Sequence, residues 1–307
     1  MVPSASPRAP RTPASDTTAA AEAPDSRTGA EGPARPPRAP RLSREELRTR
    51  VLAAAHDMLG DDGLTVGLHH LNMEELIRRV GVPRSSAFAA FGGKEQLMTD
   101  LMVDTLRPRL ADGGALSIAS DGSVAEVRRV LAENAHRMTD AAGRPDPAGG
   151  TVVLREAVRV ALVRNFHDTM GSSEWKSYMA LSVSVNSLPE NRREVVGDVL
   201  RETDTVFLER MARFYEQIFA VVHRRPRPGV TYRQLVTAGA SVVEGLVSRA
   251  LIGSESFSDD MSGPGLDGDE VPWSLVATAF WALVEGLSEE IPVSRAGAPE
   301  HDGVLSR

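Results

Sequence analysis

The sequence predicts an all-α protein, with a head of three short helices on its N-terminal side and a larger helical body after it. Leu, Val and Ala recur at the spacing of one helix face through most of the chain beyond residue 42. Glycines and prolines divide this pattern into segments of helix length. No alternating, strand-like run is longer than four residues. With 41% hydrophobic residues among 307, the chain can bury a substantial core.

Composition excludes several classes of protein. The absence of cysteine rules out disulfides, thiol catalysis and zinc ribbons. No run approaches the roughly 18 apolar residues of a membrane span, and no apolar secretion signal is present, so we expect a cytoplasmic protein without a membrane partner. The net charge of −7 argues against a protein that coats nucleic acid. Positive charge is instead local, because residues 76–94 hold four basic residues and no acidic one.

Both ends of the chain are expected to be tails. Residues 1–40 hold nine of the twenty prolines and no Leu, Ile or Phe. Such a segment buries too little apolar surface to offset backbone ordering, which costs about 1–2 kcal/mol per residue, so we expect it to be disordered. We expect a flexible C-terminal tail over 292–307, which leaves a head over 41–107 and a body over 108–291.

Capping signals outline the first two helices of the head. Ser43 and Glu46 fit a capping box at the start of the first, which stops at Gly60. Its buried face is predicted from four apolar residues at helical spacing: Leu47, Val51, Ala55 and Met58. Asn72 and Glu75 fit a second box.

Glycine and proline mark the remaining head boundaries. Gly81 ends the second helix, and Pro83 suits the start of a third over 84–91, because its missing amide would be unpaired there. Gly92 and Gly93 break that helix, and a fourth runs over about 94–107.

The body is predicted to be helical beyond residue 122. The expected helices cover 123–140, 151–170, 173–187, 190–222, 231–253 and 272–290. Residues 263–268 match the string G-x-G-x-x-G of dinucleotide-binding loops. The match follows no strand, contains a proline and is flanked by acidic residues that would repel a pyrophosphate, so we interpret it as a plain loop.

Two short helices joined by Gly81, Val82 and Pro83 have the length and spacing of a helix-turn-helix, whose second helix enters the major groove of DNA. The stretch MEELIRRVGVPRSSAFAAFGGKEQL over 73–97 resembles the DNA-binding signature of the TetR family of transcriptional regulators. Two aromatic residues three apart, followed by Lys94-Glu95-x-Leu97, keep that family's register. With the first helix, the resemblance covers 43–107.

The resemblance implies which residues meet DNA. The start of the recognition helix would contact base edges and phosphates, and the start of the fourth helix would take a phosphate. Phe88 stands where the family usually has Tyr, and Ala89 where longer polar side chains are commoner. Base readout would therefore depend on methyl contacts and DNA shape. The implied DNA-binding residues are Asn72, Arg84, Ser85, Ser86, Phe88, Ala89 and Lys94. Phe91 is instead expected in the core.

For the body, the resemblance implies a homodimer and a cavity for a small apolar or amphipathic effector. The helices over 190–222, 231–253 and 272–290 are alternatives for the dimer interface. The effector would favour a spacing of the two recognition helices that no longer matches about 34–36 Å between half-sites. Candidate lining residues are His136, Met138, His167, Trp175, Tyr178, Met179 and Phe214, although each fits plain core or surface as well.

Three functions stay open. The first is a repressor that a small effector releases from double-stranded operator DNA, in the cytoplasm of a bacterium and associated with its nucleoid. The second is an all-helical small-molecule binder or enzyme with an idle head. The third is a DNA-binding activator without a small ligand, or a regulator that answers to a protein partner. No H-E-x-x-H, P-loop or G-x-S-x-G motif is present, so we expect no catalytic residue, metal or cofactor.

Overall fold

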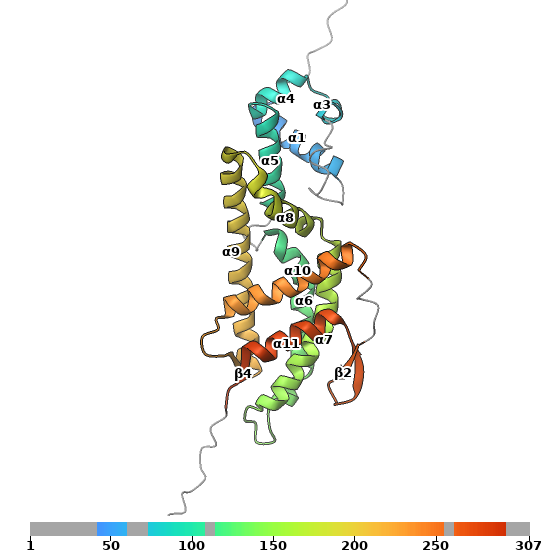
Figure 1. The fold of residues 1–307 in the computed structure, drawn as a ribbon, viewed down its shortest axis with the longest axis vertical. Coiled ribbons are helices and arrows are strands. Elements are labelled where there is room, and N and C mark those ends of the chain that lie inside the picture. Colours follow the sequence, from blue (N-terminus) through green and yellow to red (C-terminus); the bar gives the residue numbers. More distant parts are fainter. Residues whose placement is uncertain (1–41, 60–72, 108–113, 255–260, 293–307) are drawn as a thin grey trace, which may run out of the picture. The chain divides into compact units, whose positions relative to one another are not determined.

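The computed structural model of the protein describes residues 42–59, 73–107, 114–254 and 261–292, and these are mainly helical, as predicted (Figure 1). The helices of the head are α1 (Arg44–Leu59), α3 (Met73–Val80), α4 (Arg84–Phe91) and α5 (Lys94–Leu106). Those of the body are α6 (Gly114–Glu133), α7 (Pro147–Gly171), α8 (Ser173–Ser184), α9 (Glu190–Val221), α10 (Tyr232–Leu251) and α11 (Leu275–Leu287). Short 3₁₀ helices follow α6 (Ala135–Met138) and α8 (Val185–Ser187).

The first helix begins as its capping box predicts. The Ser43 amide donates to Glu46 Oε2 at 2.8 Å, and the Glu46 amide donates to Ser43 Oγ at 3.1 Å. These reciprocal bonds satisfy two amides that the first turn leaves unpaired. The predicted apolar face is confirmed, since Leu47, Val51 and Ala55 are buried.

Four short strands were not expected. β1 (Arg224–Pro226) pairs antiparallel with β4 (Ser288–Glu290), and β2 (Met261–Pro264) pairs antiparallel with β3 (Glu270–Trp273). The helix predicted over 272–290 is therefore too long at both ends. It begins only after Ser274, whose Oγ accepts from the Ala277 amide at 3.3 Å.

The G-x-G-x-x-G string lies in the β2–β3 hairpin and not in a plain loop. The Gly265 amide donates to the Asp269 carbonyl at 2.7 Å, and Gly268 takes a positive φ of 84° that favours glycine. The string thus forms a hairpin turn, whereas the dinucleotide fingerprint opens a helix.

The first body helix starts at Gly114, earlier than the predicted 123. Its first turns contain small and polar residues with a weak local helix signal. Leu116 and Ser120 are nevertheless buried, so packing against the body stabilises a helix that the local pattern does not predict.

Buried side chains form two hydrophobic clusters. The head cluster contains residues of α1, α3, α4 and α5, such as Val51, Leu76 and Phe91. The body cluster joins α6, α7, α8, α9, α10 and α11. Among the described residues, no helix is long and apolar enough to cross a membrane.

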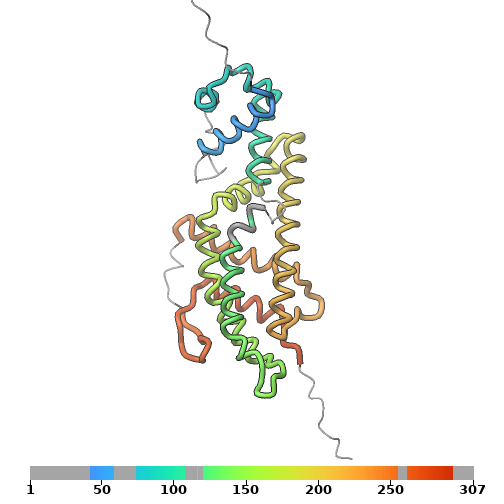
Figure 2. Tube along the Cα trace, turned by 180° about the vertical axis from the view of Figure 1, so that it is seen from behind, coloured from blue at the N-terminus to red at the C-terminus, as the bar shows by residue number. Residues whose placement is uncertain are grey.

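Helices α8 and α9 contribute to both clusters. In α9, Val196 and Val199 belong to the head cluster, whereas Phe207 and Met211 belong to the body cluster. Figure 2 shows the long α9 beside α5 and, further along, beside the body helices. Head and body therefore share two continuous helices in addition to the chain connection.

Candidate nucleic-acid interface

The turn between α3 and α4 has the backbone that its sequence predicts. Gly81 has a φ of 71°, in the left-handed region, and ends α3. Pro83 occupies the N-cap of α4 with a φ of −60°, and its carbonyl accepts from the Ser86 and Ala87 amides at 2.9 and 3.1 Å. Gly92, with a φ of 80°, ends α4. The predicted bounds of α4 are confirmed to the residue.

The two faces of α4 differ in exposure. Ala87, Ala90 and Phe91 are buried, and Phe91 is only 2% exposed, which confirms that it belongs to the core. The opposite face is exposed and carries four of the implied DNA-binding residues: Arg84, Ser85, Ser86 and Ala89. Phe88 is half-buried between the two faces. The helix thus presents one short polar surface to solvent.

Helix α1 fixes the C-terminal end of α4. Arg44 Nε and Arg48 Nη1 both donate to the Ala90 carbonyl, at 3.0 and 3.3 Å. Arg48 also pairs with Asp100 of α5 at 2.5 Å and lies 4.6 Å from the centre of the Phe91 ring. Because cations are favourable at a helix C-terminus, these contacts both position and stabilise α4.

Acidic residues of α3 partly balance the basic stretch. Arg84 Nη1 lies 3.3 Å from Glu74 Oε1, with 66% and 81% of the two side chains exposed, and its guanidinium lies 5.5 Å from the Phe88 ring centre. Hydrogen bonds from Arg78 and then Arg79 lower the pKa of the Glu75 carboxyl. Exposed ion pairs contribute about 0–1 kcal/mol, so a phosphate can replace Glu74 as the partner of Arg84.

The start of α5 offers a second cationic position. Lys94 is exposed and, among the described residues, makes no ion pair. Its helix follows Gly93, which supplies no side-chain cap, so the first amides of α5 have no side-chain acceptor there. Glu95 next to it pairs with Arg192 of α9. Asn72, the remaining implied contact, lies outside the described residues.

The body contains a cavity of about 120 Å³ between α6 and α11. Its wall is mainly apolar and includes Trp175 and Phe214, two of the candidates from the sequence. Met138, Tyr178 and Met179 pack in or against the body cluster without lining the cavity. His136 and His167 are exposed and do not line it either.

Two titratable residues of the cavity wall, Tyr215 and Glu244, were not predicted from the sequence. Burial raises the pKa of Tyr215 well above its usual range. Burial also raises the pKa of Glu244, and the Asp204 carboxylate adds to this effect, whereas the Trp175 indole N–H opposes it. A signal for Glu244 was present, because it shares a helix face with Ala240 and Val247 in an otherwise apolar pattern.

The sequence matches no protein-family model and no curated protein. Several solved structures are similar to the chain in fold. One, named as a candidate transcriptional regulator from Saccharomonospora viridis in complex with choline, has 15% identity and a TM-score of 0.44, covering 80% of this chain and 100% of its own. A TetR-family protein from Vibrio parahaemolyticus has 18% identity and a TM-score of 0.40, covering 77% and 97%.

A third similar structure is NalD of Pseudomonas aeruginosa, the secondary repressor of the MexAB-OprM multidrug efflux pump. It has 18% identity and a TM-score of 0.34, covering 79% of this chain and 93% of its own. Several of the similar structures are named TetR-family transcriptional regulators. At these identities the likeness to the TetR-family structures is one of fold.

Proposed function

We propose that the chain is a sequence-specific transcriptional regulator, in which the exposed face of α4 reads the major groove of operator DNA. One observation carries this proposal: α4 is anchored on one face by the head core and by two arginines of α1, while its other face exposes Arg84, Ser85 and Ser86. A groove-reading helix needs this combination of rigidity and exposure.

A ligand bound in the body would control DNA binding by the head. A small molecule in the cavity contacts Trp175 of α8 and Met211 of α9, and the same two helices carry Leu181 and Val199 into the head cluster. A ligand that favours one arrangement of α8 and α9 therefore favours one placement of the head. We propose release of the operator by such an effector, with a coupling of about 1–3 kcal/mol.

The regulator is proposed to act as a homodimer in the bacterial cytoplasm, at the nucleoid. Two copies are needed to place recognition helices about 34–36 Å apart on one face of DNA. Large apolar side chains remain exposed in the isolated protomer near the ends of α9 and α10, including Val221, Leu251 and Ile252. Light scattering on the purified chain tests this part, and a strictly monomeric mass contradicts it.

The DNA-reading proposal is tested by operator affinity. A duplex selected by the protein from a random-sequence library is titrated with the wild type and with Arg84→Ala. We expect Arg84→Ala to lose about 1–3 kcal/mol of binding free energy, and the salt dependence of binding to weaken. Because the Arg84 side chain is exposed and contacts only Glu74 and the half-buried Phe88 ring among the described residues, thermal unfolding should change little.

Arg129→Ala is the matched control, since Arg129 is an arginine of α6 that pairs with Glu126 and Glu133. It should leave DNA affinity unchanged. If Arg84→Ala and Lys94→Ala also leave it unchanged, the head is idle and the alternative of an all-helical small-molecule binder or enzyme is favoured. If DNA binds normally but no small molecule alters it, a regulator without a small ligand is favoured.

A further inference from the structure

The polar groups around the cavity fall into two sets. Ser123 Oγ donates to the Ser120 carbonyl at 2.8 Å and accepts from Asn165 Nδ2 at 3.2 Å, so these groups on the α6–α7 side satisfy one another. On the opposite side, Glu244 makes no ion pair with any described residue. An acceptor-only carboxylate in an apolar wall is costly unless a partner reaches it.

Trp175 supplies an independent observation. It is 3% exposed, it lines the cavity, and its indole Nε1 is buried without a hydrogen-bond partner. The indole lies near enough to act on the Glu244 carboxyl, although the two groups do not reach hydrogen-bonding geometry. A buried donor without a partner therefore lies close to a half-buried carboxylate in the same cavity wall, and a ligand that draws the carboxylate inward would bring the two groups together.

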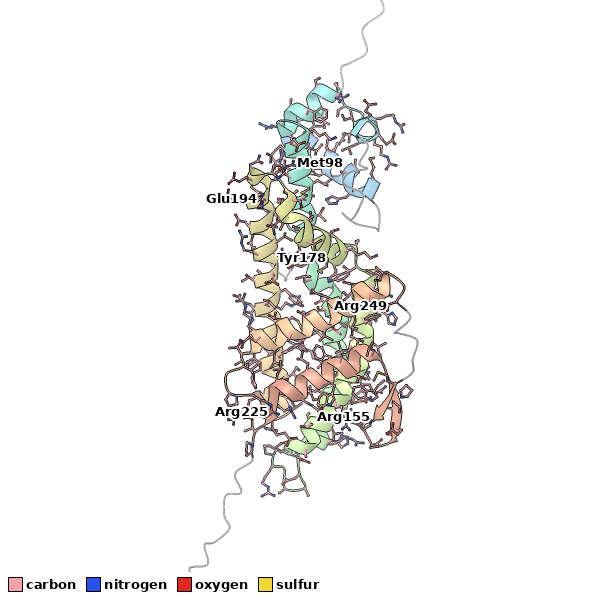
Figure 3. All side chains as sticks on the ribbon, viewed as in Figure 1. Met98, Arg155, Tyr178, Glu194, Arg225 and Arg249 are labelled. Atoms are coloured by element: carbon pink, nitrogen blue, oxygen red, sulfur yellow. The ribbon has the colours of Figure 1, made fainter. Side chains whose placement is uncertain are left out.

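The charges around Glu244 indicate the sign of that group. Asp204 of α9, whose charge acts on Glu244, is also acidic and partly buried, and burial raises its pKa while Arg233 opposes this effect. Tyr178, which is labelled on α8 in Figure 3, adds no positive charge. Burial and then the carboxylates of Asp204 and Glu244 raise its pKa to about 12. An anionic ligand would meet the Glu244 carboxylate in the wall and would also be repelled by the charge of Asp204, whereas both charges would attract a cation.

The size and lining of the cavity limit the rest of the ligand. Its volume of about 120 Å³ compares with roughly 150 Å³ for an engineered apolar cavity that binds benzene. Aromatic rings contribute to the cavity wall beside its aliphatic side chains, including those of Trp175, Tyr215 and Phe280. Aromatic faces attract organic cations that have shed their water.

We propose that the cavity takes an organic cation, an ammonium group carried on an apolar body of about one aromatic ring, with its charge held by Glu244 and Trp175. The cation neutralises the Glu244 carboxylate, and the indole N–H donates to a carboxylate oxygen drawn toward the ligand. As the effector class of the regulator, this inference rests on the proposed function, but binding itself requires no DNA.

The test is a calorimetric titration with an isosteric pair of ligands. Benzylammonium and ethylbenzene have the same shape and differ by one positive charge on the terminal group. We expect the wild type to bind the cation at least about tenfold more tightly than the hydrocarbon. Glu244→Gln should lose about tenfold in affinity for the cation and keep its affinity for the hydrocarbon. Trp175→Phe should lower the affinity for the cation more than the affinity for the hydrocarbon.

Glu209→Gln is the matched control, because Glu209 is an exposed glutamate of α9 outside the cavity wall. It should bind both ligands like the wild type, and thermal unfolding of each variant confirms that it folds. The proposal is overturned if neither ligand binds, if both bind equally, or if Glu244→Gln does not separate them. If the cation binds as expected but leaves operator affinity unchanged, the inference about the ligand stands and the proposal that this ligand releases the operator is contradicted.

Discussion

A single methyl group added at Gly239 tests the wall of the cavity. A Cβ at this position of α10 would lie 2.6 Å from Phe280 Cε2 and 3.4 Å from the Tyr215 hydroxyl oxygen. Carbon atoms pack at about 3.5–4.0 Å, so the edge of the Phe280 ring must retreat by about 1 Å. Phe280 lines the cavity, and the open space beside the ring is the cavity itself. Gly239→Ala should therefore shrink the space that a ligand uses.

Two opposing contributions set the expected stability of Gly239→Ala. Overpacking a core costs about 1–3 kcal/mol, whereas replacing glycine by alanine inside a helix stabilises by about 0.5–1 kcal/mol. We expect a net loss of about 0–2.5 kcal/mol. For a body of this size each kcal/mol lowers the Tm by about 2–4 °C. Affinity for benzylammonium should fall about tenfold, as measured by calorimetric titration.

Gly245→Ala is the control, because Gly245 lies on the same helix and a Cβ there meets no atom within 4 Å. Only the helical contribution remains, so the stability of Gly245→Ala should rise by about 0.5–1 kcal/mol with ligand affinity intact. If Gly239→Ala is stabilised as much as Gly245→Ala and keeps its affinity for the ligand, Phe280 does not pack on Gly239 and the described cavity wall is wrong.

Three further predictions concern stability, each measured by urea unfolding. Phe91→Ala removes a ring that is 2% exposed and should cost about 3–5 kcal/mol; a loss below about 1 kcal/mol would place Phe91 outside the core. Arg224→Ala removes a buried guanidinium that donates to Ser288 Oγ at 3.1 Å and should cost about 1.5–3 kcal/mol, whereas Arg225→Ala on the exposed side of β1 should cost about 0–1 kcal/mol. The raised pKa of Glu244 means that the unfolded chain releases this proton first, so stability should fall as pH rises from about 4.5 through the folded pKa. Glu244→Gln should remove that loss, and equal pH profiles would contradict it.

The head could be predicted from sequence because its boundaries depend on local chemistry. A capping box begins α1, a glycine with positive φ ends α3, and two glycines separate α4 from α5. Each of these features acts within one turn of the chain. The face of α4 follows in the same way, because helical spacing alone separates Phe91 from Arg84.

The body could be predicted only in outline, because its details depend on distant contacts. The pairing of β1 with β4 joins residues about sixty positions apart, and no local pattern in Ser288–Glu290 predicts a strand. The cavity needs side chains from α6, α7, α8, α9, α10 and α11 together, so single-helix patterns identified Trp175 and Phe214 but not Tyr215 or Glu244. The role proposed for Glu244 depends on the unpaired indole of Trp175 in another helix, which no pattern within α10 reveals.

The path from cavity to head is short because it follows two helices. From Trp175 to Leu181 in α8 is six residues, about 9 Å of helix, and this span leads from the cavity wall to the head cluster. Tyr178 lies between them and packs against both clusters. A ligand that shifts Trp175 therefore moves residues that support α5 directly, and close-packed clusters transmit such a shift because they lack the free volume to absorb it. Replacing Tyr178 by Ala should leave both ligand and DNA binding measurable while weakening the effect of one on the other.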